Sequence, residues 1–132
     1  MKKIISFLSV LLCFSFAPAE SGDCTVKYNG IYAIRLDNEH SAILRFYADG
    51  TVLASTSVND YFDVFTWFQK DNKDMVLTGT YKIKKCGIKF EVSGQTGEQK
   101  YEGMITGDKI DMELKDEASK KTVKRTYTFY AL

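Results

Sequence analysis

The chain has 132 residues, of which 45% are hydrophobic and 27% are charged, and its formal net charge is +1. This length fits one domain with a single core. A nearly neutral chain lacks the basic surface on which binding to nucleic acid or to an anionic membrane depends, so neither is expected as a partner.

The first 19 residues have the pattern of a cleaved signal peptide. Lys2 and Lys3 form a basic start, and the apolar run that follows is too short to span a bilayer. The small residues Ala17-Pro18-Ala19 provide a cleavage site, so a signal peptide at 1–19 and one domain at 20–132 are expected. Of 18 basic residues, 16 remain after the loss of Lys2 and Lys3, against 17 acidic ones, and the mature charge becomes −1. The protein is expected to be secreted or periplasmic.

The cysteines bear on the same question. Cys13 is lost with the signal peptide, which leaves Cys24 and Cys86 as an even pair in an exported chain. In an oxidising compartment such a pair is expected to form a disulfide. Two free or buried thiols are the alternative, because spacing in the sequence does not determine geometry.

The first half of the domain predicts three strands followed by a helix. The strands lie at 30–36, 42–48 and 51–58, with the strong hairpin dipeptide Asp49-Gly50 between the second and the third. Asn59 is then expected to cap a helix. Four apolar residues follow at the helical spacing i, i+3, i+4 and i+7, namely Tyr61, Val64, Phe65 and Phe68. So short a helix needs an apolar surface to lie on.

From residue 77 onward, apolar and polar residues alternate, which is typical of strands with one buried face. Short turns between these strands, such as Lys85-Cys86 and Gly107-Asp108, set apolar residues against apolar residues on that face. The same register places Met112 opposite Arg125. The strands predicted in this half are residues 77–83, 88–92, 101–105, 110–114 and 122–130.

Eight strands in a meander predict an all-β fold, an eight-stranded antiparallel up-and-down barrel with one short helix between strands three and four. A two-sheet β-sandwich is the alternative. The alternating direction of the strands puts Cys24 and Cys86 at the same end, the base. It puts the helix at the other end, where its apolar stripe is expected to plug the top of the barrel.

Several segments resemble a family of small exported lipocalin-like proteins of bacteria, most of them uncharacterised. The likeness extends over roughly residues 30–130 and rests on loose β-patterns. The Gly-x-Trp of the first lipocalin strand corresponds here to Gly30-Ile31-Tyr32. The resemblance implies the same lipocalin-like barrel. The segments are FYADGTV, WFQKDNKD, GTYKIKKCGIKF, YEGMITGDKIDMEL and the terminal YTFY.

Little in the sequence points to catalysis, and we predict that the protein is not an enzyme. His40 is the one histidine, and it lies in a turn. The chain has no Cys-x-x-Cys pair for zinc, no phosphate-binding loop and no hydrolase nucleophile motif. The acidic residues of the late strands face outward, so no pair of carboxylates converges. No catalytic residue, metal or cofactor is therefore expected.

Arg125 is the residue that the fold does not explain. Its register aims it inward, beside Tyr127, with no inward acidic neighbour. A buried unpaired charge costs several kcal/mol. Three readings stay open: the guanidinium reaches water at the rim, it meets tyrosine hydroxyls and water inside, or an anionic ligand completes it. The form Arg125-Thr126-Tyr127 is similar to the Arg-x-Tyr with which intracellular fatty-acid-binding barrels hold a carboxylate.

Two functions follow from these readings. The first is binding of a small apolar ligand with an anionic head inside the barrel of a monomer. The second is a structural or interaction protein with a filled core, which binds a macromolecule through its surface. Neither function involves membrane insertion. The ligand-binding residues predicted for the first are Arg125, Tyr127, Tyr81, Tyr101 and Met112.

Overall fold

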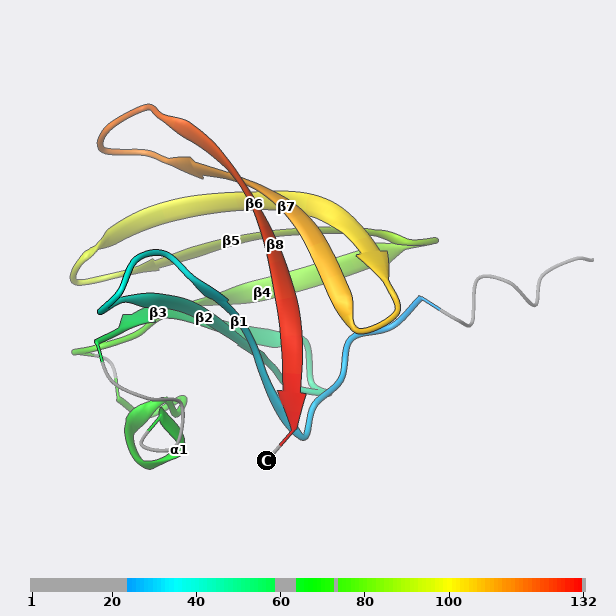
Figure 1. Ribbon diagram of the computed structural model, residues 1–132, viewed down its shortest axis with the longest axis horizontal. Coiled ribbons are helices and arrows are strands. Elements are labelled where there is room, and N and C mark those ends of the chain that lie inside the picture. Colours follow the sequence, from blue (N-terminus) through cyan, green and yellow to red (C-terminus); the bar gives the residue numbers. More distant parts are fainter. Residues whose placement is uncertain (1–23, 59–63, 73, 132) are drawn as a thin grey trace, which may run out of the picture.

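The structure, a computed structural model, describes residues 24–58, 64–72 and 74–131. Their strands form a closed antiparallel barrel in which each strand pairs with the next and β8 pairs with β1 (Figure 1). The fold is therefore the predicted up-and-down barrel and not the sandwich. In chain order the elements are β1 (Gly30–Arg35), β2 (Ser41–Phe46), β3 (Thr51–Ser57), α1 (Val64–Trp67), β4 (Leu77–Lys84), β5 (Gly87–Gly94), β6 (Gly97–Thr106), β7 (Lys109–Asp116) and β8 (Thr122–Ala131).

The predicted register of the second half is confirmed. Met112 lies opposite Arg125, and on the outer face Glu113 lies opposite Lys124. The β4–β5 and β6–β7 turns are tight, and Lys85 and Gly107 adopt positive φ angles of 58° and 61° there. Because strand side chains alternate between faces, this register sends one set of apolar residues into the barrel.

Apolar side chains pack into a core inside the barrel. Tyr32, Phe46 and Tyr127 are fully buried, and Phe90 is 3% exposed. Neighbouring rings meet edge to face, with centroids 5.4 Å apart for Tyr32 and Phe46 and 5.7 Å for Phe46 and Phe90. Edge-to-face contact is a preferred geometry of aromatic pairs. This column of rings therefore buries apolar surface and also fixes the orientation of the side chains in the core.

A second apolar cluster lies outside the barrel, and it corrects the predicted position of the helix. Val64 and Phe68 are fully buried against the outward side chains of β1, β2 and β3, with Phe65 and Trp67 packed around them. The expectation that the helix plugs the top is therefore wrong. Tyr61 and the predicted cap Asn59 lie outside the described residues. The outward residues that receive the helix are Ile31, Ala33, Ile43 and Leu53.

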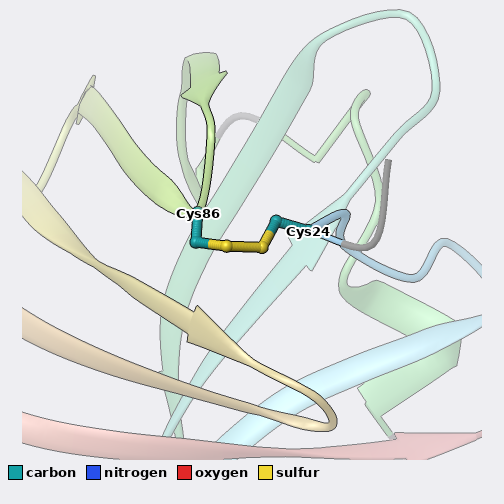
Figure 2. Close-up of a disulfide and its surroundings, with 2 residues drawn as sticks. All are labelled: Cys24 and Cys86. Carbon is teal, nitrogen blue, oxygen red and sulfur yellow. A yellow bond between two sulfur atoms is a disulfide. The ribbon is translucent and has the colours of Figure 1, made fainter. Parts of the chain in front are cut away.

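The base of the barrel is closed by the segment that precedes β1. The predicted disulfide between Cys24 and Cys86 is confirmed, with Cα atoms 4.9 Å apart, and it ties this segment to the β4–β5 turn (Figure 2). Val26 is 2% exposed and belongs to the inner core. The backbone N–H of Lys27 donates to the hydroxyl of Tyr32 at 2.9 Å, and its ammonium pairs with Asp108.

The other end of the barrel, which we call the mouth, is less tightly joined. Four residue pairs link β1 to β8 and four link β3 to β4. By contrast, β4 to β8 are joined by seven or eight pairs at each step. The β7–β8 hairpin consequently diverges from the β1–β2 hairpin towards the mouth (Figure 1). Arg125 lies in the part of β8 that extends beyond its pairing with β1.

Candidate ligand site at the barrel mouth

Arg125 points into the barrel near the mouth and is only partly satisfied. One terminal nitrogen, Nη1, donates to the hydroxyl of Tyr127 at 3.1 Å. Its Nε is buried and has no hydrogen-bond partner among the described residues. No described Asp or Glu forms an ion pair with it. Since a guanidinium has five N–H donors, most of its hydrogen-bonding capacity is unused by the fold.

Two buried tyrosines, one on β8 and one on β6, continue this polar group inside the barrel. Tyr127 is fully buried and Tyr101 is 4% exposed, and the hydroxyl of Tyr101 donates to Oε1 of Gln99 at 2.8 Å. Burial raises the pKa of Tyr101, and the neighbouring Tyr127 raises it further. Burial also raises the pKa of Tyr127, although the Arg125 guanidinium acts in the opposite direction. Both hydroxyls therefore keep their protons at neutral pH and act as hydrogen-bond donors and acceptors.

Arg125 and Tyr101 line a cavity of about 450 Å³ at the mouth. Its walls come from β3, from the loop before β4 and the first residue of β4, from the β5–β6 turn and from β6 and β8. This volume lies within the ordinary range for small-molecule sites. The lining is mostly apolar or uncharged, and the residues are Ala54, Ser55, Thr56, Asp74, Met75, Leu77, Thr96, Gln99, Tyr101 and Arg125.

A second, more open cavity of about 800 Å³ meets the other side of Arg125, and its lining comes from β6, β7 and β8 together with Ile34 of β1. Met112 and Ile34 contribute its apolar wall. Gly103 also lines it, but a Cβ there would lie 2.2 Å from the carbonyl oxygen of Asp111. That glycine therefore permits a close approach of β6 to β7 and does not open space for a ligand.

Exposed apolar side chains surround the mouth. Leu36 and Val123 are each 42% exposed, Val58 is 60% exposed and Met75 is 52% exposed. They lie at the mouth ends of β1, β8, β3 and β4 respectively. Because Leu36, Val58 and Val123 continue the inward register of their strands, they form an apolar rim above the core.

The structure brings four of the five predicted ligand-binding residues together and separates the fifth. Arg125 contacts Tyr127, lies opposite Met112 and shares the mouth cavity with Tyr101. Tyr81 lies near the base instead, where its hydroxyl donates to the carbonyl oxygen of Tyr47 at 2.7 Å. Its hydrogen-bonding capacity is used there by the β2–β3 turn.

Sequence reasoning missed two polar residues of the mouth. Gln99 lies two residues before Tyr101 on the same strand, so the alternation could have identified it as an inward-facing residue. Asp74 precedes β4 in a loop, where no periodicity applies, and its carboxylate accepts a hydrogen bond from the Gln95 amide at 2.9 Å. Its presence in the cavity lining supplies a negative charge to a site whose cation is Arg125.

Within residues 24–58, 64–72 and 74–131, no group of three or more His, Cys, Asp or Glu side chains is arranged to hold a metal ion. No helix in those segments has the length and apolar character needed to cross a bilayer. No protein-family model, curated protein or solved structure matches the chain.

Proposed function

We propose that this protein is a non-enzymatic binding protein that holds a small amphipathic anion at the barrel mouth. The observation that carries the proposal is Arg125, an inward arginine with a buried, unpartnered Nε, at the wall of a cavity with an apolar rim. An anionic head would supply the charge-assisted hydrogen bonds that the fold leaves unmade, and these are among the stronger ones.

The chemistry of the site favours binding over catalysis. Besides Gln99 and the Asp74 carboxylate, its polar groups include a guanidinium and two tyrosine hydroxyls, and burial keeps those hydroxyls protonated. Such groups donate hydrogen bonds to an anion and do not serve as nucleophiles at neutral pH. The resemblance of several sequence segments to lipocalin-like proteins also supports a ligand-holding barrel.

The test is binding of octanoate and of 1-octanol, measured by titration calorimetry with the wild type and with Arg125→Leu. We expect the variant to lose about 10- to 100-fold in affinity for octanoate, the scale of a charged hydrogen bond. Its affinity for the uncharged alcohol should change little. Arg35→Leu is the matched control, because Arg35 is an exposed arginine of the same barrel end whose guanidinium donates to the Asn38 carbonyl.

Two results would reject the proposal. One is that octanoate fails to bind the wild type, and the other is that Arg125→Leu binds it as tightly as the wild type does. Either outcome would leave the alternative function, a filled barrel that binds a macromolecule through its surface, as the better explanation of the fold.

We also propose that the protein is exported with residues 1–19 removed. The Cys24–Cys86 disulfide supports this, because such bonds persist in oxidising compartments. The mass of the protein recovered from its source should correspond to a chain that begins at Glu20. Thiol labelling after denaturation without a reductant should find no free cysteine. Two labelled thiols, or a retained N-terminal segment, would contradict export.

A further inference from the structure

We infer that the ligand is a compact monoanion whose apolar part lies across the mouth, and not a long-chain lipid that descends the barrel axis. This inference rests on the proposed function and adds the size and charge of the ligand. It follows from three features of the structure: a column of rings below the mouth, the position of the apolar rim, and the carboxylate of Asp74.

The ring column closes the barrel axis. Tyr101 stacks on Phe90 with centroids 4.6 Å apart, and Phe90 contacts Phe46 at 5.7 Å. Phe46 then contacts Tyr32 at 5.4 Å, and the hydroxyl of Tyr32 accepts the backbone N–H of Lys27 at the base. The column therefore runs from the wall of the mouth cavity to the closed base. A chain that entered along the axis would have to displace buried rings.

The space that remains for an apolar group lies at the level of the rim. Ala54 and Leu77 form the buried wall of the mouth cavity, and Met75 contributes exposed apolar surface to it. An apolar group that starts from the guanidinium of Arg125 can contact these residues only by lying sideways across the opening. The contact area is then limited by the width of the mouth and not by the length of the ligand.

The charge of the lining limits the ligand to one anionic group. Arg125 is the cation of the mouth cavity and Asp74 is its carboxylate. A second negative group on the same ligand would approach Asp74 and be repelled by it. The structure thus favours a short-chain or single-ring carboxylate over a dicarboxylate or a long-chain fatty acid.

A chain-length series tests this inference. Linear carboxylates from butanoate to dodecanoate are titrated below their micelle concentrations. Each buried methylene contributes about four-fold in affinity. We expect that gain for the shorter acids and a plateau before dodecanoate, when added methylenes extend into water. Octanedioate should bind about 10-fold more weakly than octanoate or worse.

A pair of methionine variants tests the position of the apolar part. Met75 lines the mouth and is 52% exposed, whereas Met104 is 54% exposed on the outer face of β6. Met75→Gln should weaken octanoate binding about four-fold, the scale of one lost methylene contact. Met104→Gln should leave it unchanged. Equal affinities for the two variants would overturn the placement at the mouth.

The outcomes distinguish this inference from the proposed function. If affinity rises by a constant factor up to dodecanoate and still depends on Arg125, the site exists but the ligand is not compact. If octanedioate binds as tightly as octanoate, the monoanion requirement fails. If no carboxylate binds at any length, the proposed function itself fails.

Discussion

Arg45 and Arg125 are both partly buried arginines whose Nε atoms have no hydrogen-bond partner in the part of the chain that the structure describes. Arg45 lies outside the barrel, beneath α1. Its Nη1 donates to the carbonyl oxygen of Phe68 at 3.0 Å. Its guanidinium lies over the rings of Tyr47 and Phe65, at 5.1 and 5.7 Å from their centroids. Arg45 therefore connects β2 to the end of the helix through both its charge and its flat face.

Arg125 has neither of these supports. It makes one hydrogen bond, to a tyrosine hydroxyl, and it lines two cavities. An unpartnered Nε alone therefore does not distinguish a binding arginine from a structural one, because both residues have it. The distinction comes from the remaining partners: Arg45 has a helix-end carbonyl and two rings, whereas Arg125 faces open space.

The largest effect should come from truncating Phe68, the residue whose backbone carbonyl accepts the hydrogen bond from Arg45. Phe68 is fully buried in the outer cluster. Phe68→Ala should lower the free energy of unfolding by about 3–5 kcal/mol, as for other buried aromatic residues. Urea unfolding followed by circular dichroism measures this. Phe65→Ala, at a half-buried position, should cost clearly less, and equal costs would contradict the packing described for the helix.

Arg45→Leu should destabilise the protein by about 1–3 kcal/mol, because the Phe68 carbonyl loses its buried donor and the two rings lose a cation. The same unfolding measurement applies. A variant as stable as the wild type would show that Arg45 does not stabilise the fold. It would contradict the distinction drawn between Arg45 and Arg125.

Arg125→Leu should have the opposite sign. The substitution replaces an uncompensated charge with an apolar side chain among Tyr127 and Met112, so stability should stay the same or rise by about 1 kcal/mol. This is measured without ligand. A loss as large as that for Arg45→Leu would assign Arg125 a structural role and weaken the case for the mouth site.

The smallest effect concerns the ion pair beside the Arg45 cluster. Lys70 contacts the ring of Tyr47 and donates to Asp49, and this hydrogen bond lowers the pKa of the Asp49 carboxyl from 3.8 to about 2. Because the folded-state pKa is lower than the unfolded one, the pair stabilises the fold above about pH 4, and its contribution is lost as the pH falls towards 2.

Thermal unfolding of the wild type and of Asp49→Asn between pH 5 and pH 2 tests this sign. The asparagine keeps an oxygen for the Thr51 N–H, which Asp49 Oδ1 accepts at 2.9 Å, but it removes the charge. The wild type should have the higher Tm at pH 5, and the difference should shrink towards pH 2. Parallel curves would show that the pair contributes nothing that depends on pH.

The sequence predicted the barrel well and the helix position poorly, and the two outcomes have different physical causes. In β4 to β8 one face is apolar and the other polar, so alternation and turn chemistry determine the register, as the Met112–Arg125 pair shows. In β1 to β3 the outward residues Ile31, Ile43 and Leu53 are apolar as well. Strands with two apolar faces need a cover outside the barrel, and this signal identifies where the helix packs.

The site was predictable only in part for a similar reason. The alternation of side chains along a strand indicates which face Arg125, Tyr127 and Tyr101 occupy. It does not indicate how far along the barrel axis each of them lies. Tyr81 shares their face and lies near the other end, against the carbonyl of Tyr47. Asp74 lies in a loop, where strand alternation does not apply. Its place in the mouth depends on how the chain returns from the helix to β4.

The disulfide has a consequence for the chain under mechanical load. It joins residues 62 positions apart, so β1 to β4 and the outer helix lie within a covalent ring, whereas β5 to β8 lie outside it. A force applied between Cys24 and the end of β8 would first act on the four residue pairs of the β1–β8 seam. Only the strands outside the ring could then be drawn out to full length. The half of the barrel that carries the helix would be shielded from extension, whereas the half that carries Arg125 would unravel.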